Sequence, residues 1–359
     1  MAPREIIESK AAWYGPDIDQ STDWQHRLSA DQRAEVGGAV EHLQATGRPL
    51  LETTRADFPL PTVGPLLREL LETAESGRGF LLLRNLPVET LSEEAVRSMF
   101  WGLGSHLGVA APQSEAAELI GDVRDIGHES TVTGRGYRSN DAIDFHVDQS
   151  DLVLLLSRRI AKDGGKSRLV SSVTVHNEIA RRRPDLLEVL YRPLPFKKIA
   201  YDPDVEERPW FPLPVFARRD GIFASRFSRS HIENSAQVEG APLLTPIQRE
   251  AIAFVEDVAR DPAVYLDMTF EPGDLQFVIN RLIYHARTDF EDHPEPDRKR
   301  HVLRMWLATP ASRPLPESWL ESYGSIEPAT VRGGIRAWQF PDRYGDYQRR
   351  LAASLGMRL

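Results

Sequence analysis

The feature that most limits the fold of this chain is a change in the pattern of apolar residues near residue 120. Before it, apolar residues recur at helical spacing, whereas after it short apolar runs are separated by Gly, Pro and Asp. Short apolar runs bounded by turn residues predict β-strands that pair with their neighbours. A helical beginning followed by such strands predicts an α+β protein, mainly β, built on a β-barrel or a jelly roll decorated by helices.

Residues 1–110 are predicted to be mostly helical. Ser29 and Gln32 have the spacing of a capping box, in which each side chain bonds the backbone of the other residue, and Ser92 is a second N-cap candidate. Leucines recur at helical spacing between these two sites. The predicted helices are residues 29–47, 61–77 and 92–108, with a short apolar strand at residues 79–87.

Residues from about 120 to 310 are predicted to form the strand-rich core. Pro184 interrupts a helical pattern, which predicts a kinked helix or two pieces, and Thr245 with Gln248 forms another capping box. The turn "AKDGG" predicts a hairpin between the two strands that flank it. In chain order we expect strands at 151–159 and 167–175, helices at 176–193 and 244–260, and strands at 263–270, 275–285 and 301–309.

The chain carries no internal repeat, low-complexity tract or linker, which predicts a single domain spanning residues 1–359. Its parts are the helical region 1–110, the core from about 120 to 310, and a C-terminal extension, 311–359. The extension contains Gly, aromatic and Arg residues without a clear period. No residue of the helical region points to catalysis.

Charge and hydropathy exclude several classes of partner. The formal net charge is −9 and the pI is about 5.7, which argues against binding to nucleic acid or to an anionic membrane. The longest apolar runs are far shorter than the roughly 20 residues that cross a bilayer, and the first residues lack the apolar core of a signal peptide. We therefore expect a cytoplasmic protein with no membrane partner, and a homo-oligomer is left open.

The absence of cysteine excludes disulfides, thiolate metal sites and a Cys nucleophile, so metal chemistry would have to use His and carboxylates. His146 and Asp148, in "DAIDFHVDQSD", lie two positions apart in a predicted strand, which places an imidazole and a carboxylate on one face. Such a pair is common by chance, and a hydrogen-bonded surface pair is the alternative. His285, at the end of the predicted strand 275–285, is the candidate third ligand.

Two His and one carboxylate form the facial triad of non-haem Fe(II) oxygenases, which leaves the other metal positions open for small ligands. Arg300 and Arg304 follow His285 and would share one face of a strand. A guanidinium is a rigid fork that matches a carboxylate, such as the distal carboxylate of 2-oxoglutarate. This set of residues favours an iron site with a carboxylate ligand held beside it.

The order of these residues resembles the TauD/TfdA family of Fe(II)- and 2-oxoglutarate-dependent dioxygenases. The resemblance covers about residues 80 to 310 and rests on His-x-Asp, the "GGKS" turn with Ser167, and a distal His followed by Arg-x-x-x-Arg. It extends to the phrases "AKDGGKSRLVSSVTVHNEI", "PGDLQFVINRLIYHAR" and "RKRHVLRMWLA". The resemblance implies a double-stranded β-helix, which is a jelly-roll, cupin-like fold, and it implies Fe(II), 2-oxoglutarate and O2 as cofactors.

Carried over residue by residue, the resemblance also implies roles. The iron ligands would be His146, Asp148 and His285. Arg300 would hold the distal carboxylate of 2-oxoglutarate, Ser167 would take the place of a Thr that relatives often have, and Arg304 would contact the cosubstrate or an anionic group of the substrate. Related halogenases have Gly or Ala where this chain has Asp148, so the expected reaction is hydroxylation with release of succinate and CO2.

The expected substrate is a small molecule, either an amino acid or another small carboxylate. Tyr137 and Arg138 lie in the Gly-rich loop 127–140, where they would contact the substrate or belong to a mobile surface lid. Arg226 and Arg229 would meet an anionic substrate or form ordinary salt bridges. Desaturation, cyclisation and epimerisation stay open, because they begin with the same hydrogen abstraction.

Two other functions fit parts of this pattern. A zinc hydrolase also uses two His and a carboxylate, but it would be indifferent to O2 and to 2-oxoglutarate. A non-catalytic, cupin-like binding protein would keep the fold without needing Arg300. Four other histidines lack a partner at ligand spacing and are interpreted as helix, surface or loop residues: His176, His231, His293 and His301.

Overall fold

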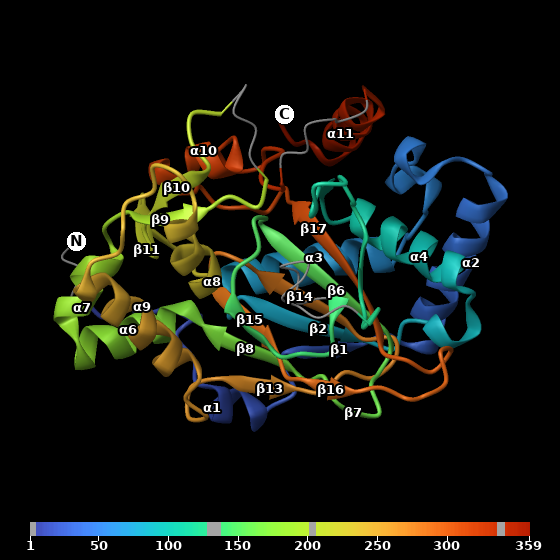
Figure 1. The fold of residues 1–359 in the computed structure, drawn as a ribbon. Coiled ribbons are helices and arrows are strands. Elements are labelled where there is room, and N and C mark those ends of the chain that lie inside the picture. The colour runs from blue at the N-terminus through green and yellow to red at the C-terminus, as the bar shows by residue number, and fades with distance from the viewer. Residues whose placement is uncertain (1–4, 128–137, 201–205, 336–341) are drawn as a thin grey trace.

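Two β-sheets form the centre of the molecule in the computed structural model, which describes residues 5–127, 138–200, 206–335 and 342–359 (Figure 1). In these residues the larger sheet has seven strands, ordered β1 (Gln25–Arg27), β2 (Phe80–Arg84), β14 (Leu275–Ile279), β6 (Leu152–Arg159), β17 (His301–Ala308) and β3 (Val109–Ala111), with β4 (Gly121–Val123) also on β17. The smaller sheet has four strands, ordered β13 (Leu266–Met268), β8 (Ser167–Ser171), β15 (Ile283–Arg287) and β5 (Ile143–His146).

The two sheets make a jelly roll and not a closed barrel, because no strand of one sheet pairs with a strand of the other within the described residues. Neighbouring strands are antiparallel except for β1 and β2. The predicted fold class, mainly β with a helical N-terminal region, is confirmed. Three short pairs lie outside the two sheets: β7 (Asp163–Gly164) with β16 (Phe290–Glu291), β9 (Leu194–Lys197) with β10 (Trp210–Leu213), and β11 (Phe216–Arg219) with β12 (Ile222–Ser225).

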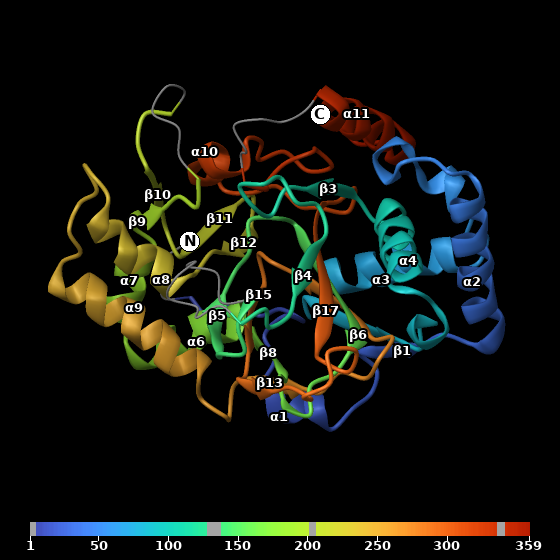
Figure 2. The ribbon, with the colours of Figure 1, turned by 45° about the vertical axis from the view of Figure 1, so that its right-hand side comes forward.

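Helices pack against both sheets. Helices α3 (Val63–Ser76) and α4 (Glu93–Ser105) contact the larger sheet, and α2 (Ala30–Ala45) contacts α4 (Figure 2). Helices α6 (Ser172–Arg182), α7 (Pro184–Leu190) and α9 (Pro246–Ala259) pack together, with α6 against β8. The shorter helices are α1 (Gly15–Asp19), α8 (Arg229–Glu233) and α10 (Leu320–Tyr323), and 3-10 turns lie at Leu50–Glu52, Arg55–Asp57, Val88–Thr90, Asn234–Gln237 and Glu317–Trp319. None of the helices in the described part of the chain is both long and apolar enough to cross a membrane.

The predicted helices are confirmed, and the N-caps of three of them lie where predicted, but the helix predicted to start at residue 176 begins earlier, at Ser172. The capping box of Ser29 and Gln32 starts α2, and the Ser92 side chain accepts a hydrogen bond from the backbone of α4. Pro184 begins a separate helix, α7, so the interrupted pattern gives two pieces. The capping box at Thr245 starts α9. These ends are set by local hydrogen bonds, which explains why short sequence motifs predict them.

The predicted hairpin between residues 151–159 and 167–175 is wrong. The first segment, β6, belongs to the larger sheet and the second, β8, to the smaller one. Gly164 and Gly165 have positive φ values of 73° and 65°, which glycine adopts readily, and they carry the chain from one sheet to the other. The strand also stops early, because the Ser171 side chain caps α6 and residues 172–175 are helical.

The predicted strand 275–285 is two strands in different sheets. The chain leaves β14 at Ile279, turns through Asn280 to Leu282, and enters β15 of the smaller sheet at Ile283. In the turn, the Leu282 N–H donates to the Ile279 carbonyl oxygen at 3.0 Å. His285 therefore lies inside the smaller sheet, and Asn280 lies at the crossing between the sheets.

The C-terminal extension packs onto the core. Helix α11 (Asp342–Leu355), shown in red in Figure 1, contacts β3. The Ala110 N–H donates to the Tyr347 hydroxyl at 2.9 Å, and the Tyr347 ring lies 5.1 Å from the ring of Trp101. Upstream of this helix, Arg332 and Gly334 contact the loop after β5 through Asp151 and Gln149.

Candidate metal centre

His146, Asp148 and His285 come together at the edge of the smaller sheet. His146 and His285 are cross-strand partners on β5 and β15, with ring centroids 4.3 Å apart. Asp148 does not share their strand face as predicted, because β5 ends at His146 and the following loop turns the carboxylate back. Its Oδ1 lies 3.7 Å from His146 Nε2, and its Oδ2 lies 3.5 Å from His285 Nε2.

The three side chains fit a divalent metal. One ligand atom of each lies within 4.8 Å of the others. The His146 Nδ1–H donates to the Asp144 carbonyl oxygen at 2.9 Å, which leaves the Nε2 lone pair directed at the site. Burial and the neighbouring His285 lower the pKa of His146 to about 4, so this imidazole is neutral at pH 7. Neutral imidazole and carboxylate suit iron better than an ion that prefers thiolate.

Two side chains of β17 hold the Asp148 carboxylate. Oδ2 accepts hydrogen bonds from Trp306 Nε1 at 2.8 Å and from Arg304 Nη1 at 3.4 Å. Burial acts to raise the pKa of Asp148, but the Arg304 and His285 side chains outweigh it and hold that pKa well below its usual range. The carboxylate is therefore ionised. The backbone N–H of Asp148 donates to Asn280 Oδ1 at 3.2 Å, which ties the loop to the crossing between the sheets.

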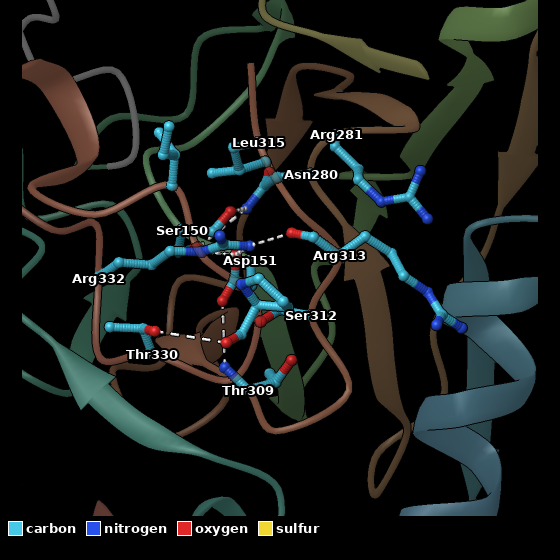
Figure 3. Close-up of polar contacts among 12 residues, drawn as sticks. Ser150, Asp151, Asn280, Arg281, Thr309, Ser312, Arg313, Leu315, Thr330 and Arg332 are labelled. Atoms are coloured by element: carbon cyan, nitrogen blue, oxygen red, sulfur yellow. Dashed lines mark hydrogen bonds and ion pairs between the residues drawn. The ribbon is translucent and has the colours of Figure 1, made fainter. Parts of the chain in front are cut away.

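A buried ion pair anchors the same loop three residues later (Figure 3). Arg332 donates to Asp151 Oδ1 at 2.8 Å, and the Thr309 N–H donates to Asp151 Oδ2 at 3.1 Å. On the other side, Asn280 Nδ2 donates to the Ser150 carbonyl oxygen at 2.9 Å. Arg332 is 1% exposed, so the pair is shielded from solvent. Arg332 was not predicted from the sequence, because it lies in an extension without a periodic pattern.

The C-terminal extension also contacts Gln149, the residue after Asp148. The Gly334 N–H donates to the Gln149 carbonyl oxygen at 2.7 Å, and Gln149 Nε2 donates to the Gly334 carbonyl oxygen at 3.0 Å. A Cβ on Gly333 would lie 2.6 Å from the Gln149 carbonyl oxygen. Only glycine permits this approach. The extension therefore lies directly on the loop between β5 and β6, which carries Asp148 and is called the metal loop below.

Arg300 is a buried cation close to the "GGKS" turn. Its side chain is stacked on Phe290 at 5.1 Å, and Nη1 donates to the Val123 carbonyl oxygen at 3.4 Å. A Cβ on Gly165 would lie 3.0 Å from Arg300 Nε. Burial lowers its pKa to about 10, so the guanidinium is charged at pH 7, yet no carboxylate of the described residues lies within 4.0 Å of it.

The other predicted cofactor residues are also buried. Ser167 Oγ lies 3.1 Å from the side-chain amide of Gln276 on β14. Arg304 Nε donates to Gln113 Oε1 at 2.7 Å, so this arginine lies at the metal end of the site, beside Asp148. Arg300 precedes β17, which corrects the prediction that both arginines lie in one strand, and a register shift follows at His301.

The four predicted substrate residues have different surroundings. Tyr137 lies outside the described residues. Arg138 pairs with Glu118 at 3.3 Å, and Arg229 pairs with Glu233 at 2.8 Å and with Glu256. Arg226 Nη2 instead donates to Gln149 Oε1 at 2.7 Å, beside the proposed metal ligand. Of the three that the structure describes, Arg226 is the one whose contacts place it next to the triad.

A second cluster, Glu93, Asp122 and His301, also has ligand-like spacing. His301 Nε2 lies 2.7 Å from Asp122, which corrects the interpretation that His301 has no such partner. Asp122 also pairs with Arg97 at 2.9 Å, and Glu93 pairs with Arg158 at 2.7 Å. Burial acts to raise the pKa of Asp122, but His301 and Arg97 lower it to about 2. The arginines already neutralise both carboxylates, so this cluster is an ion-pair network.

Comparison with known proteins identifies relatives of the whole core. The family model "Taurine catabolism dioxygenase TauD, TfdA family" matches residues 41–306. FR-33289 synthase of Streptomyces rubellomurinus is 26% identical over 319 residues, which is 88% of this chain and 94% of that protein. The taurine hydroxylase-like protein SAT17 of Stachybotrys chartarum is 27% identical over 310 residues, which is 83% of this chain and 79% of that protein.

Solved structures share the fold at lower identity. Asparagine oxygenase in complex with Fe(II), 3-hydroxyasparagine and succinate has a TM-score of 0.60 at 20% identity, over 79% of this chain and 93% of that one. The non-haem iron oxygenase OrfP with Fe and α-ketoglutaric acid has a TM-score of 0.59 at 15% identity, over 79% of this chain and 93% of that one. The chain belongs to the TauD/TfdA family and is a non-haem Fe(II)- and 2-oxoglutarate-dependent oxygenase.

Proposed function

We propose that this enzyme hydroxylates an unactivated C–H bond of a small molecule, an amino acid or another small carboxylate. The observation that carries the proposal is the convergence of His146, Asp148 and His285, with a carboxylate at the position that halogenases leave empty. When bound, Fe(II) with 2-oxoglutarate and O2 supplies the oxidant, one oxygen atom enters the substrate, and 2-oxoglutarate leaves as succinate and CO2.

The chain's own residues supply positions for this chemistry. We assign His146, Asp148 and His285 as the iron ligands. Trp306 and Arg304 hold Asp148 ionised and fixed, which keeps it available as a ligand before any metal arrives. Arg304 lies at the metal end, where it can also reach a cosubstrate or substrate oxygen.

For the cosubstrate, we propose that Arg300 binds the distal carboxylate of 2-oxoglutarate and that the Ser167 hydroxyl assists it. A buried, charged guanidinium without an acidic partner in the described residues is the support for this assignment. An anion would restore the missing counter-charge and accept the two N–H bonds of the fork.

The relatives support the substrate class. The asparagine oxygenase and OrfP structures hold 3-hydroxyasparagine and hydroxy-L-arginine, which are hydroxylated amino acids. Uridine-5'-phosphate dioxygenase of a Streptomyces species, 24% identical over 259 residues, is named for a nucleotide. Small polar metabolites with an anionic group are common to these names.

An anaerobic titration tests the proposal. Metal-free enzyme receives Fe(II), then 2-oxoglutarate, and a visible charge-transfer band reports the complex. The band should form in the wild type, and Arg300→Ala should need at least about 10-fold more 2-oxoglutarate, because a charged hydrogen bond contributes about 1.5–3 kcal/mol. The matched control is Arg298→Ala, which removes an exposed arginine paired with Glu295 and should leave the titration unchanged.

Two outcomes would contradict the proposal. If no band forms while zinc binds tightly, the triad is hydrolytic or structural. If the band forms equally in Arg300→Ala, the distal carboxylate is held elsewhere.

A further inference from the structure

Arg226 is a cation that lies next to the metal loop. It has no acidic partner among the described residues. Its guanidinium donates to two neutral acceptors, Gln149 Oε1 at 2.7 Å and Ser322 Oγ at 3.1 Å. No carboxylate of the described residues lies within 4.0 Å of it. Burial lowers the pKa of this arginine, but a guanidinium stays charged at neutral pH. A charge taken from water without a counter-charge is costly, so this position favours an anion.

The neighbouring cations do not share this property. Lys198 pairs with Glu206 at 2.9 Å, Arg208 pairs with Glu321 at 2.7 Å, and Arg229 pairs with Glu233. The chain therefore supplies acids to the cations around Arg226 but gives Arg226 itself only an amide and a hydroxyl. This contrast argues against a general shortage of carboxylates in the region.

Backbone contacts fix Arg226 beside the proposed iron ligands. The Val147 N–H donates to the Phe227 carbonyl oxygen at 2.9 Å, and His146 forms a β-bridge with Ser228. The segment after β12 thus runs along the segment that carries His146 and Asp148. The Asp148 charge acts on the pKa of Arg226, which agrees with their proximity.

Aromatic rings and a neutral imidazole surround the guanidinium. The Tyr323 and Phe211 ring centroids lie 5.6 and 5.9 Å from Arg226 Cζ. Burial raises the pKa of Tyr323 to about 12, so its phenol is uncharged. The His231 Nδ1–H donates to the Lys197 carbonyl oxygen at 2.9 Å, and burial and Arg226 lower the pKa of His231. None of these groups carries a negative charge that would repel an anion.

We propose that Arg226 is the anchor for an oxyanion of the substrate, a carboxylate, phosphonate or sulfate-like group. Tyr323 and Phe211 flank this anchor, which places the reacting part of the substrate toward the triad. The proposal rests on the proposed function and names the part of the substrate that the enzyme recognises. Tyr323 and Ser322 lie beyond the residues 41–306 that match the family model, so the C-terminal extension completes this subsite.

Small oxyanions test the subsite without knowledge of the substrate. The enzyme is loaded anaerobically with Fe(II) and saturating 2-oxoglutarate, and its unfolding midpoint is followed against acetate, methylphosphonate or sulfate at constant ionic strength. A ligand that binds only the folded state raises the midpoint in a saturable way. We expect a saturable rise of about 1–3 °C with at least one of the three anions in the wild type. The anion with the lowest half-saturation identifies the oxyanion class.

Variants decide whether Arg226 is the anchor. Arg226→Gln should lose the saturable rise and keep only the linear effect of added salt. Arg229→Gln is the matched control, because it removes a nearby arginine with acidic partners, and it should behave as the wild type. Arg226→Lys keeps the charge but loses the planar pair of N–H donors, so it should raise the half-saturating anion concentration about 10-fold. If Arg226→Gln does not fold, Arg226→Lys takes its place as the test.

The subsite and the proposed function fail in different ways. A wild type with only a linear response, or an Arg226→Gln variant with an unchanged saturable rise, would overturn the subsite. The charge-transfer band measured in the same samples reports the Fe(II) and 2-oxoglutarate site. Absence of that band in the wild type would overturn the proposed function instead.

Discussion

Asp148 shows how a carboxylate can be buried and still stay charged. One oxygen receives an indole N–H and a guanidinium N–H, both from β17, and the other faces His146. Hydrogen bonds to a charged carboxylate are stronger than neutral ones and offset part of its lost hydration. The residues that support a proposed ligand therefore matter nearly as much as the ligand.

Trp306→Phe tests the support of Asp148. Phenylalanine keeps most of the buried ring but loses the N–H that donates to Asp148 Oδ2. We expect Fe(II) affinity, measured by anaerobic titration, to fall 10- to 100-fold, because the loss of such a partner commonly has this effect. Trp101→Phe is the control: its indole is also buried and donates to Thr53, away from the triad, so affinity should stay within 2-fold of the wild type. Equal losses in both variants would show a general packing effect.

His176 gives the protein a sensitivity to acid. It is fully buried on α6, accepts from or donates to the Tyr191 hydroxyl at 2.9 Å, and lies among aromatic rings. Burial lowers its pKa from 6.5 to about 4. Between these two values the unfolded chain binds more protons than the folded one, so stability falls as pH falls through this window.

We therefore expect His176→Gln to reduce the loss of stability between pH 7 and pH 4.5. Glutamine keeps a polar side chain that can bond Tyr191 but does not titrate. Urea unfolding at pH 7 and pH 4.5 should show that the wild type loses on the order of 2 kcal/mol more than the variant. Identical losses in the two proteins would mean that His176 does not contribute to the acid sensitivity.

At the scale of elements, the sequence identifies helices and strands more readily than it identifies their partners. Capping boxes and Pro184 act within a few residues, so helix ends were predictable. The sequence of an apolar run does not indicate which sheet it joins. Residues 275–285, for example, form parts of two strands in different sheets. The turn at Asn280 moves the chain between sheets through contacts with Asp151 and Ser150, which no local pattern announces.

The candidate site divides in the same way. The proximity of His146, Asp148 and His285 could be anticipated, because ligand chemistry restricts residue type and spacing, whereas the roles of Arg300 and Arg304 stay predictions. The supporting roles of Trp306, Asn280 and Arg332 could not be predicted. No sequence spacing distinguishes these three from a tryptophan, an asparagine or an arginine elsewhere in the chain. Their role depends on tertiary contacts alone.

Arg332→Met tests the anchor of the metal loop. The change would leave Asp151 buried without its counter-charge, so we expect a loss of about 3–5 kcal/mol in the free energy of unfolding, measured in urea. Arg349→Met on α11 removes an exposed pair with Asp346 and should cost less than about 1 kcal/mol. A loss below about 1 kcal/mol in Arg332→Met would show that the ion pair does not hold the loop.

At the scale of the whole molecule, the helical N-terminal region is part of the core. Strand β2 pairs with β14, and β1 pairs with β2, so residues before 110 form one edge of the larger sheet. At the other edge, β3 pairs with β17 and contacts α11. That the whole chain is a single domain stays a prediction, which unfolding can test.

If the chain is a single domain, as predicted, it should unfold in one step. We expect the tryptophan fluorescence, which reports both the helical region and the core, and the far-UV circular dichroism to give the same urea midpoint. A fragment of residues 1–110 should not fold alone, because its strands lack β14. Two separate midpoints, or a folded fragment, would divide the chain into two domains.

The ion pair between Asp151 and Arg332 also has a consequence for how the chain folds during synthesis. A chain is synthesised from its amino end, so all three proposed ligands leave the ribosome well before residue 332 does. Until then the loop that carries Asp148 lacks its anchor. We therefore expect this loop to reach its final arrangement only after Arg332 has been synthesised and has paired with Asp151.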